Sequence, residues 1–362
     1  MLTTTLFPGR YVQGPDALKH LGDEIKRFGE KGFIITDPFV YDEILPAYLP
    51  EINKSVKTDQ ESFAGECTDK EIERLSGILK DKNTDVVTGF GGGKTIDTAK
   101  AVAYKLKKPV IIIPSLASTD APCSALSVIY TEEGEVERYL VLPENPNVII
   151  VDTKIIANAP SRFLVAGMGD ALATWFEAQS CMQGYAPNMT GNHGSMTAYY
   201  LANLCFETLL EYGEAAREAC EAGVTTPALE KIVEANTLLS GLGFESGGLA
   251  TAHSIHNGLT VLEQTHDYYH GEKVAIGTLA SLFLTDKPVN EIDEVYQFCK
   301  KTGLPFTLEH IGLKEISDED LYKVAKAATK EGETIHNEPV PVTAESVFAA
   351  LKMADQYGKK FL

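Results

Sequence analysis

About the first 150 residues alternate short, unbroken runs of Ile and Val with amphipathic segments, and this alternation constrains the fold more than any other feature of the chain. Four of the apolar runs are predicted strands: residues 32–37, 84–90, 109–115 and 147–153. The segments between them repeat apolar residues at helical spacing. Runs without alternating polar positions are typical of strands buried on both faces. The first half is therefore predicted to be an α/β fold with a parallel sheet covered by helices on both sides.

One segment of the first half has a different pattern. Residues 124–143 carry two apolar runs on either side of the sequence Thr-Glu-Glu-Gly at 131–134. Two such runs separated by a short polar turn with Gly indicate a β-hairpin. We expect this hairpin to project from the α/β part.

Helical patterns replace the strand patterns after Pro160. Ser317 with Asp320, and Thr343, are predicted to cap two of the helices at their N-termini. These changes predict an α/β domain over residues 1–158 and an all-helical domain over 159–362, with the active site in the cleft between them. The predicted helices cover residues 162–181, 195–212, 227–239, 291–302, 318–330 and 344–358.

Composition excludes several classes of function. The formal net charge of −19 disfavours a nucleic-acid partner, which needs a positive surface, and disfavours anionic membranes. No two of the six cysteines approach CxxC spacing, which argues against a Cys-zinc site or a redox dithiol. The N-terminus has no basic segment followed by an apolar run, and the apolar run at 274–284 is too short to span a bilayer. We expect a soluble, cytoplasmic protein with no membrane partner.

A glycine-rich turn follows the predicted strand at 84–90. Glycines leave no Cβ between the backbone amides and a ligand, and the first amides of the following helix favour an anion. The turn is therefore predicted to bind phosphate. It misses two familiar fingerprints by one residue each, because Thr88 stands where a Walker A loop needs Gly and Lys94 where G-x-G-x-x-G needs its last Gly. The four glycines are Gly89, Gly91, Gly92 and Gly93.

Asp37 ends the predicted strand at 32–37 and precedes Pro38. A carboxylate at a strand end is placed to accept the hydroxyls of an adenosine ribose, and it would repel a 2′-phosphate. The alternative is a helix N-cap. The ribose interpretation favours NAD over NADP.

Three histidines, His253, His256 and His270, fall within eighteen residues. If residues 249–262 are helical, the first two share a face of the helix and can converge with the third on one ion. Imidazoles with a carboxylate are a typical ligand set for a catalytic zinc ion that keeps a position open for substrate. A dinucleotide and such a metal together indicate alcohol oxidation by hydride transfer. Spacing alone leaves three candidates for the carboxylate: Asp170, Asp267 and Glu272.

Long segments of the chain resemble one known family. They are GFGGGKTIDTAKAVAY, PSLASTDAPCSALSVIYTEEGE, FLVAGMGDALATWFEA, NTLLSGLGFESGGLATAHSIHNGLT and HDYYHGEKVAIGTL. In these segments the chain is similar to the iron/zinc-containing polyol dehydrogenase superfamily, and within it to the branch that oxidises glycerol. The resemblance runs along nearly the whole chain and implies a Rossmann-like N-terminal domain with an all-helical C-terminal domain, the architecture shared with dehydroquinate synthase.

The resemblance also implies roles for the residues of the active site. By motif, Asp170, His253 and His270 are implied to be the metal ligands and also to contact the substrate. His256 is then implied to be a neighbour of the ligands or of the substrate, and not a ligand. Asp120 is implied to reach the substrate hydroxyls, and Asp120, His256 or water would carry the released proton.

The implied cofactors are NAD and one Zn²⁺ per subunit, in preference to Fe²⁺, and the implied assembly is a homo-octamer. The implied reaction is the oxidation of glycerol, or a related vicinal diol, to a ketone such as dihydroxyacetone. Together with the turn, the residues predicted to contact NAD are Asp37, Gly91, Gly92, Gly93, Lys94, Asp97, Ser115, Ser118, Ser124, Leu126 and Tyr130.

Rival functions remain open at this stage. A lyase resembling dehydroquinate synthase, or a glycerol-1-phosphate dehydrogenase, would need basic residues for a phosphorylated substrate, and the implied site is poor in them apart from Lys273. A catalytically silent NAD-binding protein would not need an intact set of metal ligands. A P-loop nucleotidase is disfavoured by Thr88.

Overall fold

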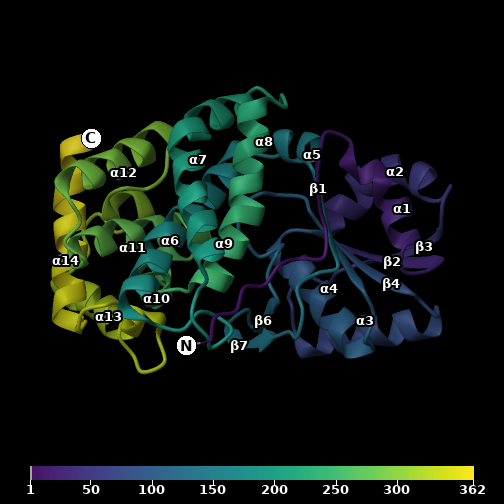
Figure 1. The fold of residues 1–362 in the computed structure, drawn as a ribbon, viewed down its shortest axis with the longest axis horizontal. Coiled ribbons are helices and arrows are strands. Elements are labelled where there is room, and N and C mark those ends of the chain that lie inside the picture. Colours follow the sequence, from purple (N-terminus) through teal and green to yellow (C-terminus); the bar gives the residue numbers. More distant parts are fainter. Residues whose placement is uncertain (1) are drawn as a thin grey trace.

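A computed structural model describes residues 2–362, with a sheet-containing part on the right of Figure 1 and a helical part on the left. The sheet has six parallel strands in the order β1-β8-β5-β4-β2-β3. This confirms the predicted α/β fold with a parallel sheet. The strands are β1 (Tyr11–Gly14), β2 (Lys31–Thr36), β3 (Lys57–Ser62), β4 (Val86–Gly91), β5 (Val110–Pro114) and β8 (Val148–Asp152).

Alternate residues of the central strands enter two separate cores. In β2, Ile34 packs in the core that includes α1 (Leu21–Lys26) and α2 (Leu45–Ile52), whereas Phe33 and Ile35 pack in the core that includes α3 and α4. A sheet buried on both faces needs no polar alternation, which explains the unbroken Ile and Val runs. The second pair of helices is α3 (Asp69–Asp81) and α4 (Gly93–Leu106).

The two edge strands, β1 and β3, were not predicted from the sequence. β1 pairs with β8, and β3 pairs with β2 through Lys57↔Lys31 to Ser62↔Thr36. β3 lies at the edge of the sheet, and the side chains of its sequence, KTDQES, are all polar and exposed or half-buried. Edge strands often carry charged residues that discourage pairing with other chains.

The predicted hairpin is confirmed. β6 (Leu126–Tyr130) and β7 (Val136–Val141) pair antiparallel, with Leu126 opposite Val141 and an irregularity next to Tyr130. The hairpin follows the segment that carries several predicted NAD contacts, so its first strand forms part of that region.

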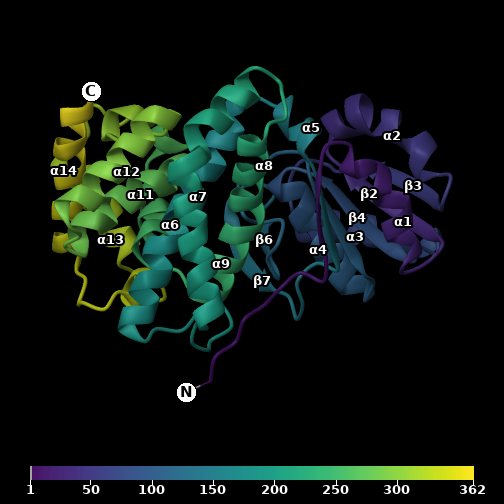
Figure 2. The same cartoon turned by 45° about the horizontal axis from the view of Figure 1, so that its top comes forward.

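The second half is helical, as predicted, and Figure 2 shows its helices beside the sheet from a second direction. Ser317 and Thr343 cap their helices, which confirms both predictions. Three helices, α6, α7 and α12, are longer than predicted, and α9 and α11 were not predicted as helices. The helices are α5 (Thr153–Ala157), α6 (Ser161–Gly184), α7 (Met196–Glu221), α8 (Pro227–Glu234), α9 (Ser240–Gly247), α10 (Thr251–Leu259), α11 (His270–Leu284), α12 (Val289–Thr302), α13 (Asp318–Ala328) and α14 (Ala344–Gly358).

The six cysteines are buried and free. Within residues 2–362, no helix combines the length and the apolar character that a membrane span requires.

Candidate functional site

The glycine-rich turn and two predicted NAD contacts lie at one edge of the sheet. Asp37 follows β2, the turn follows β4, and Ser115 follows β5. Because β4 lies between β2 and β5 and all three are parallel, their carboxyl ends meet. Ligands of open α/β sheets bind at such carboxyl ends. The structure therefore brings the predicted phosphate and ribose contacts together.

The four glycines of the turn serve different purposes. A Cβ at Gly89 would lie 2.5 Å from Cβ of Ala99, so this glycine allows α4 to pack closely on β4. A Cβ at Gly91 would lie 2.6 Å from Oδ2 of Asp37. Gly92 and Gly93 are less crowded, since a Cβ at Gly92 would meet only Cδ1 of Leu116, at 3.9 Å, and a Cβ at Gly93 would meet no described atom within 4 Å. The helix N-terminus is thus open to an anion at these last two positions.

Two charged side chains of the predicted NAD site have partners within the protein. Oδ1 of Asp37 accepts a hydrogen bond of 2.9 Å from the backbone N–H of Val40, which is the helix-capping contact that is the alternative to a ribose role. Its other oxygen faces the turn. Nζ of Lys94 lies 2.5 Å from Oε1 of Glu66 and 4.9 Å from the centre of the Tyr130 ring.

Asp97 is buried, and its carboxylate holds the hairpin rather than facing the open turn. Oδ2 accepts a hydrogen bond of 3.0 Å from the backbone N–H of Val128, and Oδ1 lies 3.1 Å from Nζ of Lys100. Burial raises the pKa of Asp97, and Lys100 acts in the opposite direction. The prediction that Asp97 contacts NAD finds no support in this geometry.

Lys100 is a residue that the sequence analysis missed. Its side chain is fully buried, and its ammonium donates to three backbone carbonyls of residues 121–126, which end at the first residue of β6. The spacing of a lysine in a helix gives no sign of such contacts, since the acceptors lie more than twenty residues away. The acceptor oxygens and their distances from Nζ are Leu126 at 2.6 Å, Ala121 at 2.9 Å and Ser124 at 3.3 Å.

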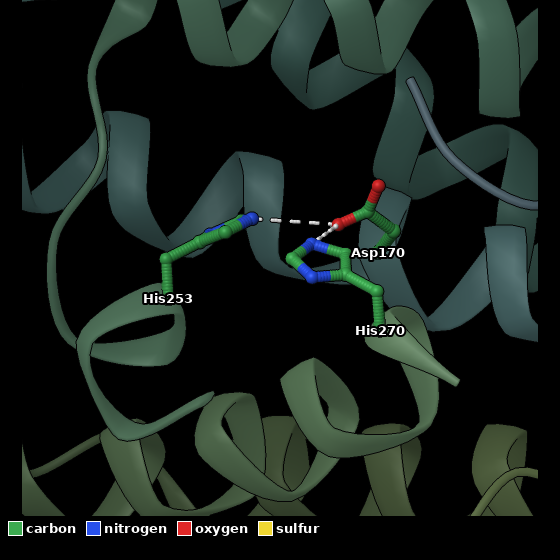
Figure 3. A group of neighbouring side chains, drawn as sticks. All are labelled: Asp170, His253 and His270. Carbon is green, nitrogen blue, oxygen red and sulfur yellow. Dashed lines mark ion pairs between the residues drawn. The ribbon is translucent and has the colours of Figure 1, made fainter. Parts of the chain in front are cut away.

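Asp170, His253 and His270 converge from three helices, α6, α10 and α11 (Figure 3). Nε2 of His270 lies 3.1 Å and Nε2 of His253 3.4 Å from Oδ1 of Asp170. One ligand atom from each residue lies within 4.8 Å of the others, and this is the single group of its kind found among residues 2–362. The structure therefore brings together the three predicted metal ligands.

Glycines allow the helices to approach closely enough for this convergence. A Cβ at Gly169 would lie 2.3 Å from the carbonyl oxygen of Gly271, and a Cβ at Gly271 would lie 1.8 Å from that of Ala166. Each of these two distances is far shorter than a van der Waals contact. The backbones of α6 and α11 thus touch beside Asp170 and His270. Gly277 allows the same approach between α11 and Ala252 of α10, next to His253.

The environment of the triad fits a divalent cation. Oδ1 of Asp170 is buried and has no hydrogen-bond partner among residues 2–362, which is costly unless a cation or proton is present. Burial alone would raise the pKa of Asp170, but His270 and His253 lower it overall. For His253, burial lowers the pKa, yet the nearby carboxylates of Glu177 and Asp170 raise it well above its usual value. A cation bound between these groups would replace the protons.

His256 is not part of the triad. Its Nε2 lies 3.0 Å from Nδ1 of His270, and its Nδ1 lies 3.1 Å from Oδ1 of Asn257. Burial and the neighbouring His270 hold the pKa of His256 well below its usual value. Convergence of all three histidines on one ion, the arrangement that spacing allowed, is therefore wrong.

The other two carboxylates left open by spacing lie outside the triad. Glu272 accepts from Arg162 at 2.6 and 2.8 Å and from the backbone N–H of Tyr269 at 2.8 Å. Asp267 is exposed. Neither belongs to the group around His253 and His270.

Asp120 links the loop after β5 to the triad. Its backbone N–H donates to Oδ2 of Asp170 over 3.2 Å, and its Oδ2 accepts from the hydroxyl of Ser240 over 2.8 Å. Burial and the neighbouring Asp170 raise the pKa of Asp120 well above its usual value. The nearby Gly167 in α6 allows the loop to approach, since a Cβ there would lie 2.0 Å from the carbonyl oxygen of Ala117.

Comparison with known proteins agrees with this arrangement. A family model described as iron-containing alcohol dehydrogenase matches residues 8–153. The chain is 67% identical to a glycerol dehydrogenase of Thermotoga maritima over 359 residues, which cover 99% of this chain and 98% of that protein. It is 53% identical to a glycerol dehydrogenase of Citrobacter freundii over the full length of both.

Solved structures give the same result. The crystal structure of glycerol dehydrogenase from Schizosaccharomyces pombe superimposes with a TM-score of 0.95 at 38% identity, covering 99% of this chain and 92% of that one. The chain therefore belongs to the iron-containing alcohol dehydrogenase family, in the branch formed by the glycerol dehydrogenases.

Proposed function

We propose that the protein oxidises glycerol to dihydroxyacetone, and related vicinal diols to the corresponding ketones, with NAD and a divalent cation held by Asp170, His253 and His270. The observation that carries the proposal is the convergence of two imidazole Nε2 atoms on a buried carboxylate oxygen beside the loop from β5. Curated relatives at 67% and 53% identity, both glycerol dehydrogenases, support glycerol as the substrate.

The ligand set favours zinc over iron in this proposal. Two imidazoles and one carboxylate are a typical set for catalytic zinc with an open fourth position. His256 is turned toward His270 and does not supply a fourth protein ligand. When bound, the cation would act as a Lewis acid that lowers the pKa of a substrate hydroxyl and supports transfer of hydride to the nicotinamide.

Asp120 is the side chain to which we assign contact with the substrate hydroxyls and transfer of the released proton. One oxygen of its carboxylate accepts from Ser240, which leaves the other for the substrate. Both ring nitrogens of His256 are engaged, one by His270 and one by Asn257, so His256 orients His270 instead. A carboxylate whose pKa is raised by burial is suited to proton transfer near neutral pH.

NAD would lie across the carboxyl ends of β2, β4 and β5. Its phosphates would meet the open amides at Gly92 and Gly93, and the ribose would meet Asp37, which disfavours NADP. Asp97 supports this region through Lys100 and Val128. The remaining predicted contacts are Gly91, Lys94, Ser115, Ser118, Ser124, Leu126 and Tyr130.

Three wider predictions complete the proposal. Residues 1–158 would form the NAD-binding domain and residues 159–362 the metal-binding domain, with the active site between them. The protein would assemble as a homo-octamer. It would work in the cytoplasm without a membrane or nucleic-acid partner.

The test is NADH formation, followed by absorbance, with glycerol and NAD before and after chelation. We expect the chelator to abolish turnover, and zinc to restore it better than iron. Turnover that survives complete removal of metal would contradict the metal assignment. No turnover with any small diol, despite bound metal and NAD, would contradict the dehydrogenase assignment.

A further inference from the structure

Glu177 is a buried carboxylate on α6, two helical turns after Asp170, and lies directly behind His253. Its side chain is 1% exposed. Oε2 lies 2.6 Å from Nδ1 of His253, and Oε1 accepts hydrogen bonds of 3.0 Å from the backbone N–H groups of His253 and Ala250. Three contacts to one short segment fix this carboxylate against the start of α10.

We propose that Glu177 is a positioning residue that holds His253 in the form that binds the metal, an inference that rests on the metal site proposed above. The two nitrogens of His253 face two carboxylates, because Nδ1 faces Glu177 and Nε2 faces Asp170. Nδ1 donates its proton to Glu177, which leaves the lone pair of Nε2 directed at the metal position. A carboxylate bonded to the second ring nitrogen fixes both the tautomer and the orientation of a ligating histidine.

The second ligating histidine has a different partner. Nδ1 of His270 meets the ring of His256, whereas Nδ1 of His253 meets the carboxylate of Glu177. Asp170 and Glu177 therefore place two carboxylates at this site, one in contact with the metal position and one behind His253. Glu177 thus contributes to metal affinity through charge as well as geometry.

Replacement of Glu177 by Gln tests this role at nearly constant volume. The single oxygen of Gln can accept either from the two backbone N–H groups or from His253, but not from both. If the oxygen stays with the backbone, the amide N–H₂ faces Nδ1 and favours the tautomer whose proton is on Nε2, where the metal should bind. The matched control is Glu338→Gln, since Glu338 is also buried near the start of α10 but accepts its 2.5 Å hydrogen bond from the hydroxyl of Thr251.

The measurement is the zinc dissociation constant of the full-length protein, obtained by competition with a chromophoric chelator. We expect Glu177→Gln to raise it by about 10- to 100-fold, the usual cost of losing such a partner. Glu338→Gln should stay within about twofold, and the NAD affinity of both variants should be unchanged. Equal zinc affinity in Glu177→Gln and the wild type would overturn the inference.

Failure of the proposed function would be distinguishable, because a wild-type protein that binds no zinc would contradict the metal site itself.

A second measurement does not depend on whether the Glu177→Gln variant folds. In zinc-loaded wild type labelled with ¹⁵N-histidine, NMR should show a hydrogen-bonded Nδ1–H for His253, assigned by its loss in His253→Ala. An unprotonated Nδ1 would overturn the inference equally.

Discussion

At the scale of single residues, Lys100 shows how one buried charge can organise a binding region. Its ammonium meets the carboxylate of Asp97 and three carbonyl oxygens of residues 121–126, so it ties α4 to the segment that leads into β6. Both partners are buried. Removing one charge of a buried pair leaves the other uncompensated, which costs more than the pair itself contributes.

Lys100→Met is expected to lower the free energy of unfolding by about 3–5 kcal/mol, because Asp97 loses its cationic partner. Urea denaturation measures this change. The matched control is Lys105→Met, also in α4, where an exposed lysine pairs with Glu73 on the surface. Surface pairs contribute about 0–1 kcal/mol, so the control should change little. Similar losses in both variants would contradict the role of Lys100.

The loss in Lys100→Met should also depend on pH. Burial raises the pKa of Asp97 above 3.8 and Lys100 opposes that rise, so the pKa should rise further in the variant. A carboxyl group with a raised native pKa favours folding at low pH, and this contribution is lost as the pH rises through the native pKa. The difference between wild type and variant should therefore be largest near pH ~8 and shrink toward pH ~4. A difference that is constant over this range would contradict the explanation.

At the scale of elements, the proposed metal site depends on how closely three helices pack. Gly169 and Gly271 let the backbones of α6 and α11 touch, and Gly277 does the same for α10 and α11. A methyl group at any of these positions would meet backbone atoms that cannot rotate away. The helices would have to separate, and the ligands at their ends would separate with them.

Gly271→Ala is expected to destabilise the protein by about 1–3 kcal/mol, a typical cost of overpacking, and to weaken zinc binding. Thermal denaturation and chelator competition measure the two effects. Gly77→Ala in α3 is the control, since this exposed glycine has no described atom within 4 Å of an added Cβ. It should stabilise the protein by about 0.5–1 kcal/mol. Unchanged zinc affinity in Gly271→Ala would show that the close approach of α6 and α11 is not needed.

Elements differ in how clearly their sequences predict them. The four strands buried on both faces, β2, β4, β5 and β8, were predicted to within a few residues because their composition reflects burial. The edge strands β1 and β3 were missed because none of their side chains is fully buried at the margin of the sheet, so their composition is polar or mixed. The helix α11 carries apolar residues on all sides, so it shows an apolar run without the helical period.

At the scale of the whole molecule, a bound cation would connect three helices of the second half and, through Asp120, the loop after β5. A ligand that binds only the native state stabilises it by mass action. Metal binding and global stability should therefore be coupled in this protein.

Zinc at a concentration about 100 times its dissociation constant is expected to stabilise the dialysed protein by about 2.7 kcal/mol. Thermal denaturation at increasing zinc concentrations measures this shift. His253→Ala removes one ligand and should show almost no zinc-dependent shift while it still binds NAD. An equal shift in His253→Ala would mean that zinc acts at another place.

The sequence by itself determined the α/β half and the helical half, the glycine-rich turn, and the histidines among which the proposed metal ligands lie. These features depend on local patterns: burial on both faces, the helical period, and side chains that neighbour each other along the chain. Only the tertiary structure decided which groups meet. Glu177 lies 76 residues from His253 and Lys100 up to 26 residues from its acceptors, so neither contact has a local signature. Spacing along the chain left Asp170, Asp267 and Glu272 open, and only the family motif pointed to Asp170; the close packing of α6, α10 and α11 brings Asp170 to the two histidines.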